Sequence, residues 1–125
     1  MIKTIHTKNA PEAIGPYSQA IEANGLVFCS GQIGLDPKTG ELVQSIESQT
    51  RRVMDNLVGV LSAAGTDLSF VVKTTIYLKN ISDFPVVNSI YAEYFNTHKP
   101  SRATVAVADL PKGALIEIDA IAVKA

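Results

Sequence analysis

The residues with the clearest chemical potential are one arginine and one glutamate in the stretch 100–118, PSRATVAVADLPKGALIEI. This stretch predicts two short neighbouring strands joined by a Pro-Lys-Gly turn, with Arg102 at the entrance of the first strand and Glu117 in the middle of the second. A guanidinium is a planar, bidentate receptor for a carboxylate ligand. A carboxylate in so apolar a strand is costly to bury unless it is paired, hydrogen-bonded or hydrated. Together they indicate a small-molecule site in which a cation holds the substrate and an acid performs chemistry.

A simpler interpretation of the same two residues stays open at this point. An arginine near a strand start is usually a solvated charge, and a glutamate within a strand usually marks the face that meets water. Strand alternation also predicts two opposite faces, one with Leu115, Glu117, Asp119 and Ile121 and the other with Ile116, Ile118, Ala120 and Ala122.

Length and charge restrict the class of protein. The 125 residues predict a single domain over 1–125. Eleven basic and twelve acidic residues give a net charge of -1, which favours neither nucleic acid nor a membrane surface as partner. The longest apolar runs fall short of the roughly 18 residues that a membrane span needs. Because the N-terminus also lacks the apolar region of a signal peptide, we expect a cytoplasmic protein.

The residues that usually bind metals or form covalent intermediates are sparse. The single cysteine, Cys29, excludes an internal disulfide, and its apolar surroundings, LVFCS, predict a small buried core residue. His6 and His98 lie far apart in polar segments, where surface residues are expected rather than metal ligands. No phosphate-binding loop, dinucleotide fingerprint or nucleophile elbow occurs. Two classes of function remain, which are catalysis without a cofactor and the binding of a ligand without chemistry.

The elements that would position the site follow from hydrophobic periodicity. Apolar residues recur every three or four positions in a predicted helix over about 45–64 and in a second over about 84–96. Asn24-Gly25 predicts a hairpin turn between extended segments. Further strands are expected at 2–6, 70–78 and in the stretch 100–118. The order βββαβαββ predicts an α+β fold, a mixed six-stranded sheet with two helices on one face.

The uncovered face of this sheet would be too apolar for solvent. It is expected to carry residues such as Thr104, Val105 or Glu117 among aliphatic neighbours. Burial against other subunits is the simplest remedy, so the sequence predicts an oligomer.

Four further residues are candidates for a pocket. A glycine inside a strand often marks a bulge or a close approach of backbone to a ligand, so Ser30 and Gly31 are a possible pocket wall. Asn88 lies beside the apolar stripe of the second helix, where an exposed polar residue is an equal alternative. Tyr17 follows a proline in a loop, where an aromatic ring plugs a core as often as it closes a pocket.

Several motifs together resemble one known family. They are Pro100-Ser101-Arg102-Ala103, Val105, Ala108, Leu110 and Ile116-Glu117-Ile118, with AIGPYSQ at 13–19, SGQI at 30–33, VKTT at 72–75 and Val87-Asn88 with Tyr91. Over essentially its full length the chain resembles the Rid family, the YjgF-like reactive intermediate deaminases. The resemblance implies a chorismate-mutase-like subunit in a homotrimer, with clefts between adjacent subunits.

The resemblance also implies an activity without cofactor or metal. Similar members hydrolyse 2-iminobutanoate and 2-iminopropanoate, which pyridoxal-phosphate dehydratases of amino-acid metabolism release, to 2-oxo acids and ammonia. Carried over to this chain, Arg102 would clamp the substrate carboxylate, and Glu117 would activate water and shuttle protons to the leaving amine. A protonated imine is already electrophilic, so orientation and one proton-handling group would suffice.

The remaining residues would then shape the substrate-binding site. Tyr17 would line or close the pocket, the backbone of Ser30 and Gly31 would contact the ligand, and Asn88 would support the wall. Thr104 belongs to this set too, at a position where close relatives often have cysteine. Threonine keeps a hydrogen-bonding group but lacks the thiol, so thiol-dependent behaviour of relatives is not expected to carry over, whereas imine hydrolysis should survive.

Two other functions stay open. A regulatory module could bind 2-oxo acids in the same clefts and act through a protein partner. Endoribonuclease activity, attributed to some relatives, is disfavoured by the near-neutral charge and the absence of a basic stripe studded with aromatic residues.

Overall fold

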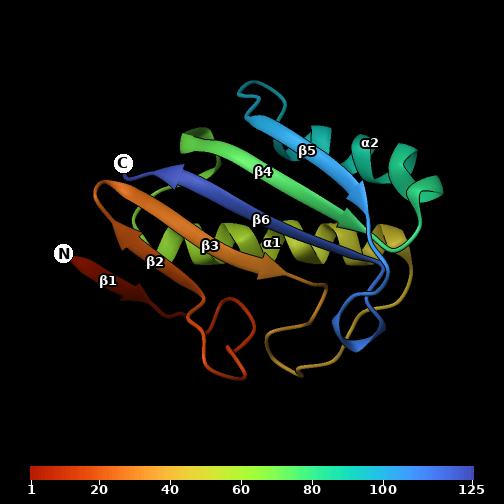
Figure 1. The fold of residues 1–125 in the computed structure, drawn as a ribbon, viewed down its shortest axis with the longest axis horizontal. Helices are drawn as coiled ribbons and strands as arrows, with labels where there is room; N and C mark the ends of the chain where they lie inside the picture. Colours follow the sequence, from red (N-terminus) through yellow and green to blue (C-terminus); the bar gives the residue numbers. More distant parts are fainter.

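The computed structural model describes all of residues 1–125 and contains one six-stranded mixed sheet with both helices behind it (Figure 1). The strands lie in the order β1-β2-β3-β6-β4-β5. The elements are β1 (Ile2–Ile5), β2 (Ala20–Ala23), β3 (Leu26–Gln32), α1 (Ile46–Ala63), β4 (Val71–Leu78), α2 (Phe84–Tyr94), β5 (Ser101–Ala106) and β6 (Ile116–Val123). The predicted α+β fold with two helices on one face is confirmed.

The topology explains why the two helices share a face. β6 is antiparallel to both β3 and β4, so β3 and β4 run in the same direction, and β5 is parallel to β4. The helices α1 and α2 are therefore crossovers that connect parallel strands and move across the sheet in the same sense. Because such crossovers are right-handed, both must pack on the same side.

The β2–β3 hairpin forms where the Asn-Gly pair predicts it. Asn24 has a φ of 57° and Gly25 a φ of 80°, the pair of positive values that a tight two-residue turn requires. The paired strands run from Ala20 opposite Cys29 to Ala23 opposite Leu26. This confirms the predicted turn and fixes which residues of β3 face the helices.

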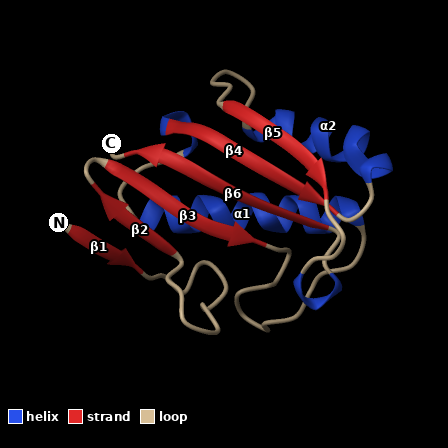
Figure 2. Cartoon of the chain, in the orientation of Figure 1, coloured by secondary structure: helices blue, strands red, loops and turns tan.

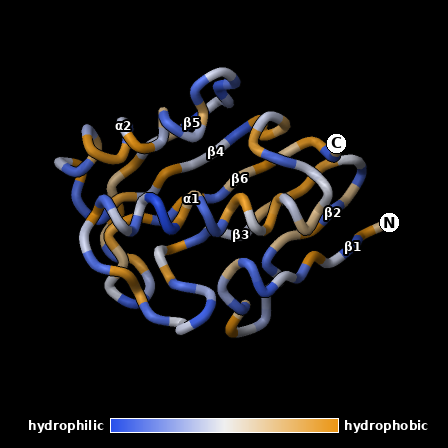
Figure 3. The backbone as a smooth tube through the Cα atoms, turned by 180° about the vertical axis from the view of Figure 1, so that it is seen from behind, coloured by the Kyte–Doolittle hydropathy of each residue, from blue (hydrophilic) through white to orange (hydrophobic).

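Helix α1 supplies much of the core. Its predicted apolar stripe is confirmed, since Val53, Leu57 and Val60 are buried, and the coloured tube seen from behind alternates between polar and apolar along this helix (Figure 3). Ser45 caps the helix, because its side chain accepts a hydrogen bond from the Ser48 amide at 3.2 Å. Gly65 follows the C-terminus with a φ of 77°, a conformation that glycine adopts without a steric penalty.

Strand β6 lies at the centre of the sheet and alternates as expected. Ile116, Ile118, Ala120 and Ala122 are buried against the helices, whereas Glu117, Asp119 and Ile121 are half-buried on the opposite face. We call this opposite side, which neither helix covers, the open face.

The prediction that the last two strands neighbour each other across a Pro-Lys-Gly turn is wrong. β4 lies between β5 and β6, as the labelled strands show (Figure 2). β5 arrives through the α2 crossover and pairs in parallel with β4, which leaves the other edge of β4 for β6. The turn at Pro111–Gly113 belongs to a longer connection, and Glu117 is the second residue of β6 rather than a central one.

The open face carries exposed apolar side chains, as predicted, but one residue expected there lies elsewhere. Phe28 and Val105 are exposed there, with relative accessibilities of 42% and 43%. Thr104 instead pairs with the fully buried Ile76 and shares the side of β5 that faces α2. The prediction that Thr104 belongs to the uncovered face is therefore wrong.

Neither α1 nor α2 combines the length and apolar character that a membrane crossing requires.

Candidate functional site

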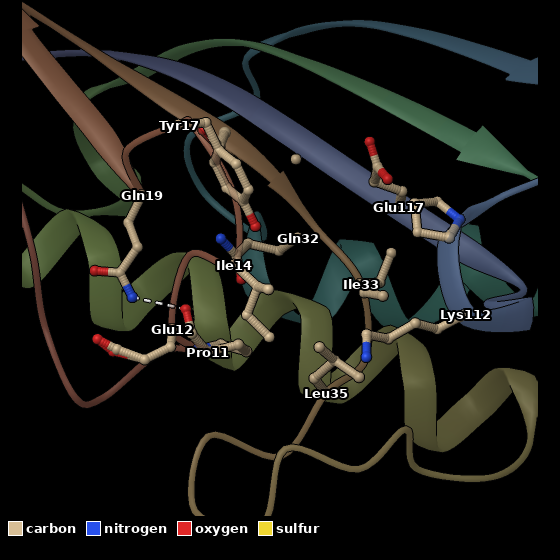
Figure 4. Close-up of a pocket in the computed structure, with 13 residues that line it drawn as sticks. Pro11, Glu12, Ile14, Tyr17, Gln19, Gln32, Ile33, Leu35, Lys112 and Glu117 are labelled. Atoms are coloured by element: carbon tan, nitrogen blue, oxygen red, sulfur yellow. Dashed lines mark hydrogen bonds between the residues drawn. The ribbon is translucent and has the colours of Figure 1, made fainter.

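A cavity of about 500 Å³ opens beside Glu117 (Figure 4). The N-terminal segment contributes Ile14 and Tyr17 to its lining, and β3 contributes Ser30 and Gly31. The volume lies within the roughly 300–1,000 Å³ typical of small-molecule sites. Tyr17, Ser30 and Gly31, three residues singled out in the sequence, thus lie in one cavity with Glu117.

A bulge in β3 makes room for the Glu117 carboxylate. The pairing of β3 with β6 shifts between Cys29 and Gln32, so Ser30 and Gly31 leave the regular ladder. A side chain on Gly31 would place its Cβ 2.8 Å from the carboxyl carbon of Glu117, closer than such atoms normally approach. A larger residue at position 31 would push the Glu117 side chain out of this place. The bulge predicted from a glycine inside the strand is confirmed.

The environment of Glu117 raises its pKa. Burial is the larger cause, because the charged form loses hydration, and the nearby Asp119 carboxylate adds like-charge repulsion. Asp119 in turn accepts a hydrogen bond from the Tyr77 hydroxyl at 3.1 Å. A carboxyl group that holds its proton more tightly than usual is suited to exchange protons with a bound ligand.

Replacing Asp119 by asparagine should lower the pKa of Glu117. The substitution removes the negative charge that raises this pKa while preserving an acceptor for the Tyr77 hydroxyl. If Glu117 works as a base, kcat/KM should fall as the pH drops and the carboxylate becomes protonated. The midpoint of this fall should lie above pH 4.5 in the wild type and at lower pH in Asp119→Asn. An unmoved midpoint would show that a different group controls it.

Buried amide side chains hold the walls of this cavity. Gln19 is 2% exposed and donates hydrogen bonds to the carbonyl oxygens of Thr7 at 3.0 Å and Pro11 at 2.7 Å, the latter drawn in Figure 4. Asn56 of α1 donates to the carbonyl oxygens of Ile33 at 3.2 Å and Leu35 at 3.0 Å. These bonds fix the segment that follows β1 and the segment that follows β3. Without them, the carbonyl groups of these segments would lie unpaired against the core.

A second cavity, of about 430 Å³, adjoins Arg102. It is lined by Asn88, Tyr91, Ala92, Phe95, Lys99, Pro100 and Arg102, from α2 and the segment that leads into β5. Arg102 donates a hydrogen bond from Nη1 to Asn88 Oδ1 at 2.8 Å. The second cavity therefore combines a cation with an aromatic wall.

The structure does not bring the two principal residues together within one chain. Arg102 points from edge strand β5 toward α2, whereas Glu117 lies on the open face of β6, with β4 between the two strands. Asn88 accompanies Arg102, and Tyr17, Ser30 and Gly31 accompany Glu117. Thr104 lines neither of these two cavities.

Sequence reasoning missed part of each cavity. Lys112 lines the first with a φ of 57°, and its side chain reaches toward Ile33 and Leu35 (Figure 4). No periodic pattern marks this lysine, because it lies in the connection before β6. Next to the second cavity, the rings of Phe84 and Tyr91 lie against Arg102. Their helical spacing had placed them beside Asn88, but nothing local in the sequence placed Arg102 between them.

Cysteine and histidine occupy structural positions. Cys29 is buried, and burial together with the Asp119 charge raises the pKa of its thiol to about 12, so it stays protonated as expected of a core residue. His6 is exposed and pairs with Glu12 at 2.6 Å. His98 is half-buried rather than on the surface, with Nε2 2.6 Å from the Val71 carbonyl oxygen.

The sequence and the fold both resemble those of known proteins. The family model described as endoribonuclease L-PSP matches residues 7–124. The chain belongs to this family, which includes the Rid (YjgF-like) proteins. A RutC family protein of Pyrococcus horikoshii is 54% identical over 125 residues, with 99% of each chain covered. The 2-iminobutanoate/2-iminopropanoate deaminase of Salmonella typhimurium is 45% identical over 127 residues, again with 99% of each covered.

A solved Rid structure has nearly the same fold. The crystal structure of a protein of the conserved Rid family from Yersinia pestis superimposes with a TM-score of 0.97 at 54% sequence identity, covering 98% of this chain and 99% of that one. The resemblance stated from the sequence motifs is thereby confirmed at the level of family and fold.

Proposed function

We propose that this protein hydrolyses reactive 2-imino acids, with 2-iminobutanoate and 2-iminopropanoate as substrates, to 2-oxo acids and ammonia. The observation that supports this most is the half-buried Glu117, whose pKa is raised, at the wall of a small-molecule cavity. A relative named for this reaction is 45% identical to the chain from end to end. The even balance of eleven basic and twelve acidic residues favours such small acids over RNA.

The proposed reaction needs one group that moves protons. Glu117 in its charged form takes a proton from water while the water oxygen bonds to C2 of the protonated imine, and the C=N electron pair passes to nitrogen. The resulting carbinolamine receives that proton on nitrogen from Glu117. The C–N bond then breaks, ammonia leaves, and loss of the hydroxyl proton to Glu117 completes the 2-oxo acid. Glu117 finally releases this proton to solvent.

The proposed site is shared between two subunits of a homotrimer. The exposed apolar side chains of the open face, such as Phe28 and Val105, favour a cover, and the Glu117 and Arg102 cavities lie apart in one chain. A neighbouring subunit that presents Arg102 to the Glu117 cavity would supply the carboxylate clamp. In this arrangement Tyr17, Ser30 and Gly31 come from one chain and Asn88 from the other, while Thr104 follows Arg102 on its strand. We place this trimer in the cytoplasm, among enzymes of amino-acid metabolism that release imines.

A coupled assay tests the proposed function. Threonine dehydratase generates 2-iminobutanoate, and 2-oxobutanoate is then measured with time. The protein at concentrations far below that of the imine should accelerate 2-oxobutanoate release in proportion to its amount, because each site turns over repeatedly. A protein that binds 2-oxobutanoate in calorimetry yet leaves this rate unchanged would be a regulatory binding module instead.

A further inference from the structure

The guanidinium of Arg102 rests in a cradle formed by one face of α2. Its Cζ lies 5.3 Å from the ring centroid of Phe84 and 5.0 Å from that of Tyr91, and Nη1 donates to Asn88 Oδ1 at 2.8 Å. Phe84, Asn88 and Tyr91 stand at positions i, i+4 and i+7, which place three side chains on the same side of a helix. We call these three residues the α2 cradle.

The cradle is anchored to the sheet beneath it. The Tyr91 hydroxyl and Thr74 Oγ1 lie 2.7 Å apart, and both residues are buried. Thr74 is also the residue of β4 that pairs with Arg102 of β5. The tyrosine ring packs further against Phe95 at a centroid distance of 4.8 Å. Thr74 of β4 therefore holds both the backbone of Arg102 and the Tyr91 ring beneath its guanidinium.

This arrangement leaves one edge of the guanidinium free. Within the chain no hydrogen bond or ion pair engages Nε or Nη2 of Arg102, and Nη1 alone is used by Asn88. The Nε–Nη2 edge presents two parallel N–H groups that match the two oxygens of a carboxylate.

The members of the cradle share one electrical property, which is that none carries a formal negative charge. Ring faces attract a cation through their quadrupole, and an amide oxygen accepts a hydrogen bond without neutralising the donor. An aspartate at position 88 would hold the guanidinium equally well but would compete with a ligand carboxylate for its charge. A neutral cradle therefore orders the arginine and keeps its full charge for the ligand.

We propose that Phe84, Asn88 and Tyr91 are positioning residues that hold Arg102 with its Nε–Nη2 edge turned to the substrate carboxylate. This proposal deepens the proposed function, because it assigns the free edge to the α-carboxylate of a 2-imino or 2-oxo acid. The cradle acts through Arg102 and does not itself touch the reacting atoms.

The charge argument is tested at Asn88, with 2-oxobutanoate as the probe and its Kd measured by calorimetry. Asn88→Asp should weaken binding about tenfold or more, because an ion pair to the neighbouring carboxylate neutralises the guanidinium. Asn88→Ala should weaken it only a few-fold, since the charge stays available. The melting temperature of Asn88→Asp should be at least that of the wild type. Unchanged 2-oxobutanoate binding by folded Asn88→Asp would overturn the proposal.

The ordering argument is tested at Phe84 without any substrate. Nitrogen-15 relaxation of the Arg102 Nε–Hε group in the ligand-free protein reports how firmly the guanidinium is held. Phe84→Leu preserves apolar volume but removes a ring face, so it should increase this mobility and weaken 2-oxobutanoate binding about two- to fivefold. Phe70→Leu, the same change at an exposed phenylalanine outside both cavities, should do neither.

The outcomes separate this inference from the proposed function. Equal Arg102 mobility in the wild type and Phe84→Leu would overturn the cradle, whether or not the protein turns over imines. A wild type with an ordered Arg102 but no effect in the coupled dehydratase assay would overturn the deaminase function and leave the cradle intact.

Discussion

Replacing Arg102 by alanine should lower kcat/KM for 2-iminobutanoate roughly 10²- to 10³-fold, because truncation of one partner in a desolvated charge pair typically costs about 2–5 kcal/mol. Arg102 is exposed in the single chain, and its bonds go to one side chain of α2, so the fold should survive. The coupled dehydratase assay measures the effect, and thermal unfolding checks that the variant is folded.

A lysine at position 102 is the matched control for this experiment. Arg102→Lys retains a positive charge but cannot offer two parallel N–H donors, so its kcat/KM should lie between those of the wild type and Arg102→Ala. If Arg102→Ala works as well as the wild type, the substrate carboxylate is held elsewhere and the proposed clamp is wrong.

Two inactive variants should restore activity when their subunits are mixed. Arg102→Ala retains Glu117, and Glu117→Gln retains Arg102, but homotrimers of either kind lack one half of every cleft. If a cleft takes Glu117 from one subunit and Arg102 from its neighbour, random 1:1 trimers contain about one complete cleft in four, since each half is intact about half the time. At equal total protein, the mixture should therefore recover about a quarter of the wild-type rate.

The matched control mixes wild-type chains with the double variant Arg102→Ala/Glu117→Gln. A site shared between chains leaves about one quarter of the clefts complete, whereas a site within one chain leaves about one half. Coexpression of the two chains in equal amounts lets them assort at random, which these fractions require. No recovery in the first mixture together with about half activity in the second would refute the shared site.

Local patterns were sufficient to predict most individual elements. The helical stripe of α1, its cap at Ser45 and the Asn24-Gly25 turn each depend on residues a few positions apart, so their outcome is decided within the segment. The alternation of β6 was equally readable, because every second residue is apolar without exception from Ile116 to Ala122. Gly31 was recognised as unusual inside a strand, although its partner, Glu117, became evident only in three dimensions.

Pairing between distant strands was harder to predict. Proximity in sequence suggested that β5 and β6 are neighbours, but β5 is drawn to β4 by the α2 crossover, and β6 fills the remaining place. The same error put Arg102 and Glu117 closer together than they are. Thr104 was assigned to the wrong face because nothing local fixes the register of an edge strand, whereas its pairing with the buried Ile76 does. The roles of these residues in binding and catalysis stay predictions.

The central place of β6 has a consequence for synthesis of the protein. Of the six strands this one is translated last, yet it forms the contact between the β1-β2-β3 half of the sheet and the β4-β5 half. While β6 is still inside the ribosome, the nascent chain has two partial sheets with unpaired edges at β3 and β4, which are prone to pair with other chains. The six-stranded sheet can therefore close only after β6 has emerged, and chaperone protection should matter most until then.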